Sequence, residues 1–142
     1  MKFKVFFISI FLLYSSFSFA VSDEWIIASG TPDKTVLMYF NKDELVKRDG
    51  YLLVWLMASF KEPKTIPGDV LVQSHRTLIA TDCKKPYTYR DLHKTLFKGP
   101  MMTGGVSLLI DKSMLEKRGI AYSGKGSLID IAIHGACEYG SL

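Results

Sequence analysis

The stretch GSLIDIAIHGACEYG, residues 126–140, decides the fold, because its apolar residues fit either a strand or a helix. A strand would explain isoleucine at alternate positions, and β-branched residues modestly disfavour a helix. A helix would explain Ser127 followed three residues later by Asp130, which resembles a capping box. Apolar residues also recur at helical spacing, at Leu128, Ile129, Ala132, Ile133 and Ala136. The residues favour the helix and leave the strand open.

The N-terminus indicates export. Lys2 and Lys4 precede the apolar run VFFISIFLLY, which ends in SSFSFA with small residues Ser18 and Ala20 at the cleavage positions. This pattern predicts a signal peptide over residues 1–20, cleaved after Ala20. An uncleaved anchor would need about 20 apolar residues, and this run has about 10 before serines interrupt it. We expect an exported protein, in the periplasm or on the outer cell surface, with no integral membrane span after signal removal.

The mature chain has the size of one domain and a nearly balanced charge. Removal of 20 from 142 residues leaves 122, enough for a single domain over residues 21–142. The chain has 18 basic and 14 acidic residues, and two lysines leave with the signal, so the mature net charge falls from +4 to +2. Charges of both signs are mixed, as in NKDELVKRDG, whereas a nucleic-acid-binding protein carries a clustered basic face. We expect no nucleic-acid partner.

Export also predicts a disulfide bond between Cys83 and Cys137. The compartment is oxidising, and the chain has two cysteines, an even number. The alternative is a cysteine nucleophile working with one of the histidines, His75, His93 or His134, and that chemistry needs a free thiolate. The compartment and the even number favour the structural bond.

Motifs for catalysis, nucleotides or metals are weak. GIAYSGKGS places Gly119, Gly124 and Lys125 at the spacing of a phosphate-binding loop, but Gly126 stands where Ser or Thr would hold magnesium. A flexible loop that leads into the helix is the simpler interpretation. The three histidines lack metal-ligand spacing, and no Ser, His and Asp arrangement stands out. We predict no catalytic residues, no metal site and no cofactor.

The remaining chain alternates apolar runs with turn signals, which is typical of one β-rich domain. Strands are expected in EWIIAS, TVLMYF, YLLVWLMASF, VLVQSHRTLIATDC, PYTYRDLHKTLF and VSLLI. PYTYRDLHKTLF also fits helical spacing, but its Tyr and Thr content favours a strand. Between the strands, NKDELVKRDG is expected to be a polar connection with at most one helical turn. KEPKTIPGD should break the sheet at its prolines, and DKSMLEKRGIAYSGKG should be polar and irregular.

At this point the chain resembles the surface-adhesin protein E family of bacterial envelope proteins. The resemblance rests on Trp25, VLMYFNKDELVKRDG, VWLM, SHRTLIATDC, the aromatic and basic strand after it, and GSLIDIAIHGACEYG. The last is the most specific, because family members there have a small-residue helix with a cysteine followed by x-Tyr-Gly. The resemblance implies an α+β fold, with an antiparallel sheet of about six strands and a C-terminal helix on one face. The Cys83–Cys137 bond would tie the helix to the sheet.

The second face of this sheet also needs a cover. In YLLVWLMASF, Tyr51, Leu53, Trp55 and Met57 fall on one face, and the residues between them on the other are apolar too. The expected helix covers one face only. The family's founding member is dimeric, so the resemblance implies a homodimer through the other face.

The segment SHRTLIATDCKKPYTYR interleaves basic and aromatic residues. In the family, the segment that leads into and past this cysteine binds host extracellular matrix and serum proteins such as vitronectin and laminin. Arg and Tyr suit interface hot spots. The alternative is a solvated strand edge and turn. The resemblance implies that partner binding involves Arg76, Lys84, Lys85, Tyr87, Tyr89 and Arg90.

These observations favour a non-enzymatic, exported envelope protein that binds other proteins, an adhesin for host matrix or serum proteins. The alternative is a small periplasmic enzyme or enzyme inhibitor. A deep pocket that contains His75 or His93 would favour this alternative.

Overall fold

The computed structural model describes residues 24–141, so the expected signal peptide at 1–20 and its cleavage site lie outside the described residues. The strands are β1 (Trp25–Gly30), β2 (Val36–Asn41), β3 (Val46–Arg48), β4 (Tyr51–Ile66), β5 (Val70–Thr81), β6 (Thr88–Phe97), β7 (Val106–Leu109) and β8 (Ile120–Tyr122). The helices are the 3-10 turn η1 (Pro100–Met102), α1 (Lys112–Arg118) and α2 (Leu128–Gly140).

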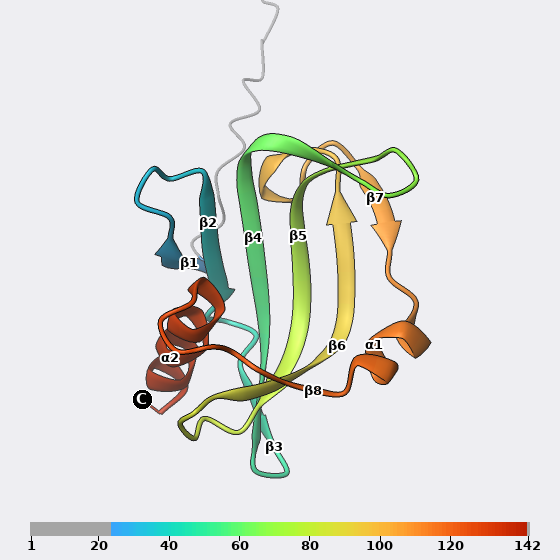
Figure 1. Cartoon of the computed structure of the whole chain (residues 1–142). Helices are drawn as coiled ribbons and strands as arrows, with labels where there is room; N and C mark the ends of the chain where they lie inside the picture. Colours follow the sequence, from blue (N-terminus) through green and yellow to red (C-terminus); the bar gives the residue numbers. More distant parts are fainter. Residues whose placement is uncertain (1–23, 142) are drawn as a thin grey trace, which may run out of the picture.

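All strand pairs are antiparallel, and six strands form a continuous sheet in the order β1-β2-β4-β5-β6-β7. The short strand β3 pairs with β4, and β8 pairs with β6. Figure 1 shows α2 packed against the sheet beside β1 and β2, with α1 at the opposite side beside β6. The predicted α+β fold and its C-terminal helix are therefore confirmed, and the opening stretch is a helix.

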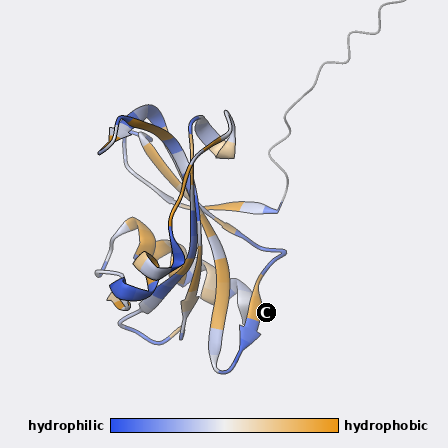
Figure 2. Ribbon diagram, turned by 90° about the vertical axis from the view of Figure 1, so that its right-hand side faces the viewer, coloured by the Kyte–Doolittle hydropathy of each residue, from blue (hydrophilic) through white to orange (hydrophobic). Residues whose placement is uncertain are grey.

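The core lies between α2 and one face of the sheet. Val54 and Ile79 from the central strands and Ile133 from α2 are completely buried in it. Small residues let the helix approach the strands closely, since Ala132 and Ala136 are also fully buried. Figure 2 shows hydrophobic residues, in orange, along the strands of the sheet. The predicted apolar stripe of the helix is thus the surface that builds the core.

The other face of the sheet is covered at one end by the loop that carries η1. The backbone amide of Met101 donates to Ser59 Oγ (3.2 Å), and that of Met102 donates to Ser74 Oγ (2.8 Å). Beneath this loop Met57 is completely buried, whereas Tyr51, at the far end of β4, is 50% exposed. A homodimer through this face stays a prediction.

Three connections differ from the sequence expectation. NKDELVKRDG contains β3 in place of a helical turn. KEPKTIPGD does not break the sheet, because β4 continues to Ile66, and Pro63 lies in the register shift between Ser59 and Lys64 where no ladder hydrogen bond is needed. DKSMLEKRGIAYSGKG is ordered as α1 and β8.

The helix α1 has signals that we did not use in predicting an irregular segment. Asp111 Oδ1 accepts a hydrogen bond from the backbone amide of Ser113 (2.7 Å), which caps the first turn. Leu115 anchors the helix with 1% of its surface exposed. Gly119 then ends it with a φ of 63°.

Candidate functional site

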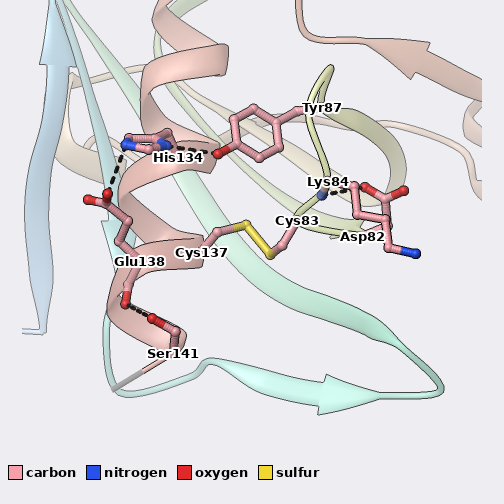
Figure 3. The surroundings of a disulfide bond; sticks show 8 residues. All are labelled: Asp82, Cys83, Lys84, Tyr87, His134, Cys137, Glu138 and Ser141. Carbon is pink, nitrogen blue, oxygen red and sulfur yellow. Dashed lines mark hydrogen bonds and ion pairs between the residues drawn. A yellow bond between two sulfur atoms is a disulfide. The ribbon is translucent and has the colours of Figure 1, made fainter.

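The predicted disulfide is present between Cys83, just after β5, and Cys137 in α2 (Figure 3). The two Cα atoms are 5.7 Å apart, although the residues are separated by 54 positions in sequence. The bond therefore fixes the turn between β5 and β6 against the C-terminal helix. This turn is the centre of the segment for which we predicted partner binding.

The turn between β5 and β6 contains a local hydrogen bond, a residue with a positive φ and a cis peptide bond. Asp82 Oδ1 accepts from the backbone amide of Lys84 (3.0 Å), Cys83 has a φ of 58°, and the Lys85–Pro86 peptide bond is cis. The side chains of Lys84 and Lys85 in this turn are exposed to solvent. The turn thus presents two positive charges on a rigid support.

Tyr87, which was predicted to bind a partner, lies in the core. Its ring is 5% exposed, and its hydroxyl is 2.8 Å from His134 Nδ1 on α2. His134 Nε2 is in turn 3.0 Å from Glu138 Oε1 (Figure 3). Tyr87 therefore supports the turn from the core, and Lys84 and Lys85, close to it in sequence, carry the exposed side chains.

Two hollows adjoin this turn and share Tyr122 as a lining residue. The first, of about 530 Å³, is lined by Tyr51, Tyr89, Arg90 and Ile120, among others. The second, of about 680 Å³, is lined by Lys85, Tyr87 and Lys125, among others. Tyr122 is 73% exposed. We refer to the lining residues Tyr51, Lys85, Arg90, Ile120, Tyr122 and Lys125 as the Tyr122 surface.

The backbone of β8 adds a second feature to the Tyr122 surface. In the part of the chain that the structure describes, β8 pairs with β6 only, so its outer edge is a row of backbone groups outside the ladder. Ile120, at the start of this strand, is 62% exposed. Such an edge can add a strand from another chain, with the exposed side chains selecting the sequence.

The segment that resembled a phosphate-binding loop forms the N-terminal cap of α2. Asp130 Oδ1 accepts from Ser123 Oγ (2.6 Å), Asp130 Oδ2 accepts from the backbone amide of Gly126 (3.0 Å), and Ser127 Oγ accepts from the amide of Asp130 (3.2 Å). The protein's own carboxylate thus occupies the donors near the start of the helix. The structure matches a loop that leads into a helix.

The hydrogen bonds from Ser123 and then Gly126 hold the pKa of Asp130 below its ordinary value of 3.8. Because the folded state keeps this carboxylate ionised at a lower pH than the unfolded state does, the stabilisation is present above about pH 4 and is lost as the pH falls further. We predict that Asp130→Asn lowers the free energy of unfolding at pH 7, and that the variant and the parent converge as the pH falls below the pKa that Asp130 has in the folded state. Urea titrations across this range measure the difference. A difference that is independent of pH would contradict the prediction.

Arg76 lies apart from the other predicted residues and lines neither hollow of the Tyr122 surface. Its guanidinium stacks over the ring of Trp55 at 4.7 Å, and Trp55 meets the ring of His93 edge-on at 5.6 Å. This cluster belongs to the sheet face that carries Met57, because Arg76 pairs with Met57 across the ladder. Sequence proximity to Cys83 therefore gave no guide to its position.

Sequence reasoning missed Tyr51, Ile120, Tyr122 and Lys125 as parts of the surface. The signal was present in IAY, where Ile120 and Tyr122 alternate with Ala121 as in a strand. Such a short run was not recognised as a strand, and Tyr51 was assigned only to the sheet face.

Within residues 24–141, no group of three or more His, Cys, Asp or Glu side chains could hold a metal ion. The same residues include no helix of sufficient length and hydrophobicity to cross a membrane. The part of the site that the structure describes consists of aromatic and basic side chains around a strand edge. These features define a class of small, disulfide-tied domains with an exposed aromatic and basic surface.

The chain belongs to the surface-adhesin protein E family, whose sequence model matches residues 25–138. This match confirms the resemblance and supports the role of a surface adhesin. Comparison with curated proteins and with solved structures finds no match.

Proposed function

We propose that this protein is an exported, non-enzymatic adhesin that captures host extracellular matrix or serum proteins, such as vitronectin and laminin, on the Tyr122 surface. The observation that carries the proposal is the position of Tyr122, 73% exposed between two hollows and on a strand that pairs with β6 alone among residues 24–141. The proposal includes cleavage of the signal peptide after Ala20. Membership in an adhesin family supports the binding role.

The chemistry of the Tyr122 surface suits an acidic, extended segment of a partner protein. Tyr51 and Tyr122 offer large, partly exposed rings, which are typical of interface hot spots. Lys85, Arg90 and Lys125 add positive charges around them. Rim charges of this kind raise the rate of association with an acidic partner, and a guanidinium can pair with both oxygens of a carboxylate.

We predict that Lys84→Glu, Lys85→Glu and Arg90→Glu together weaken binding to vitronectin or laminin by roughly tenfold. Each exposed charge contributes only about 0.2 to 1 kcal/mol, so the three are changed together. The loss should shrink at high ionic strength, because salt screens exposed charges. Biolayer interferometry at two salt concentrations, with circular dichroism to confirm folding, measures the effect.

A matched control is Lys34→Glu, Lys61→Glu and Lys98→Glu, which makes the same change in net charge at exposed positions outside the surface. This control should bind as the parent does. Tyr122→Ala should weaken binding by roughly thirtyfold, the loss expected for a hot-spot tyrosine. Equal losses in the control and in the triple variant, or parent-like binding by Tyr122→Ala, would place the binding site elsewhere. Absence of binding by the unmodified protein would remove these host proteins as partners.

A further inference from the structure

A third hollow lies away from the Tyr122 surface. It is lined by the C-terminal part of β4, the N-terminal part of β5, the C-terminal part of β6 and the last residue of α1. It has a volume of about 270 Å³. Its apolar walls come from Phe60, Ile66, Val72, Leu96 and Ile110. Four of these five side chains are aliphatic, so the walls suit a flexible hydrocarbon chain.

The polar lining of this hollow is entirely basic. It consists of Lys64, His75, Lys94 and Arg118, and no acidic side chain of residues 24–141 contributes to the lining. The ammonium group of Lys64 lies 4.3 Å from the centre of the Phe60 ring. The guanidinium of Arg118 is 3.9 Å from Asp91 Oδ2, and its side chain is 54% exposed, so it can still reach a ligand.

Lys94 places a positive charge in a position that is partly removed from water. Its side chain is half-buried, and among residues 24–141 it forms no ion pair, although Asp91 lies near enough to favour its charged form. Burial lowers the pKa of Lys94, as expected for a cation that is partly removed from water. Burial and the charge of Lys94 lower the pKa of His75 to about 4, so His75 is neutral at pH 7.

The hollow contains His75, and a deep pocket with this residue was expected to favour an enzyme or enzyme inhibitor. Among the described residues, however, its lining holds no carboxylate, hydroxyl or thiol that could work with the imidazole. It combines apolar walls with positive charge that lacks a partner in the lining. A buried charge of this kind is stabilised by an opposite charge with hydrogen-bonding capacity.

We propose that this hollow binds an acyl chain with an anionic head, the head paired with Lys94 and Arg118 and the chain against the aliphatic walls. Such a ligand supplies the missing negative charge, and Arg118 can hold a carboxylate with two hydrogen bonds. Each methylene buried should improve affinity about fourfold until the hollow is full. The ligand can come from a free fatty acid or from an anionic lipid, and the experiment separates these sources.

The test uses the mature chain with labelled Ile, Leu and Val methyl groups, observed by NMR during titration with decanoate. The methyl signals of Ile66, Val72 and Ile110 should shift and saturate, and that of Ile27, on a distant edge strand, should not. Hexanoate should bind more weakly, and decyltrimethylammonium, with the same chain and a positive head, should leave these methyls unchanged. A second titration uses vesicles of phosphatidylglycerol. Shifts of the same methyls with vesicles alone would support the site and assign its source as lipid.

Lys94→Met keeps the length of the side chain and removes its charge. We expect it to weaken decanoate binding at least tenfold without destabilising the fold, since an apolar side chain of similar length replaces a cation that is partly removed from water. Lys98→Met, at an exposed position beyond the end of the same strand, is the matched control and should bind as the parent does. The proposal is overturned if neither decanoate nor vesicles shift the three methyls. It is also overturned if decyltrimethylammonium shifts them equally, or if Lys94→Met binds decanoate as the parent does.

Discussion

Replacement of both Cys83 and Cys137 by serine should lower the free energy of unfolding by about 4 kcal/mol. The bond closes a loop between residues 54 positions apart, and its loss releases the unfolded chain from that constraint. Domains of this size are stable by about 5 to 15 kcal/mol, so the variant should be close to unfolding at 37 °C. Guanidinium titration of the mature chain, followed by circular dichroism, measures the loss.

Reduction of the parent protein is the natural control for this variant. The reduced parent and the double serine variant should unfold at the same denaturant concentration, because both lack the same constraint. A loss below about 1 kcal/mol would mean that the bond adds little to stability beyond the packing of α2. Free thiols in protein taken from the cell envelope would contradict the structural role of the bond itself.

Ile133→Ala should lower the free energy of unfolding by about 2 to 5 kcal/mol. Ile133 is completely buried between α2 and the sheet, and its truncation removes buried methyl groups and leaves a cavity. The matched control is Ile131→Ala on the same helix, since Ile131 is 42% exposed. That change should alter stability by less than about 0.5 kcal/mol. Urea titrations of the two variants and the parent give both values.

The contrast between the two isoleucines tests how α2 is oriented on the sheet. Similar losses for both variants would contradict the packing in which Ile133 faces the strands. A larger loss for Ile131→Ala would require the helix to be rotated. The expected order follows from burial alone, because the two residues have the same side chain and the same helical environment.

Much of the fold could be predicted from the sequence because its signals are local. The apolar run in 51–58, with both faces apolar, identified the strand that became β4, and the cap at Ser127 with the apolar stripe after it favoured α2. The register shift in β4 was not predictable, because it depends on how β4 pairs with β5. The short elements α1 and β8 were missed for different reasons. The cap and stop signals of α1 were present but weak in a polar segment, and β8 is stabilised only by its pairing with β6.

The candidate site was predictable only in part, because a surface is assembled from distant segments. The sequence drew attention to the turn at Lys84 and Lys85 and correctly paired the cysteines that hold it. It did not show that Tyr87 meets His134, 47 residues away, and is therefore buried. Nor did it bring Tyr122 next to Thr88, or Ile120 next to Arg90, since both neighbours come from the pairing of β8 with β6.

Hydrogen–deuterium exchange of the mature protein, alone and in complex with vitronectin or laminin, is the most direct test of the proposed binding surface. A bound partner should slow exchange at Tyr51 and in residues 82–90 and 120–125, which carry the Tyr122 surface. It should leave β7 unchanged, because β7 pairs with the opposite end of β6 from β8. Slowed exchange along β8 in particular would indicate that the partner adds to its free edge. Protection confined to other segments, or no complex with either protein, would contradict the proposed function.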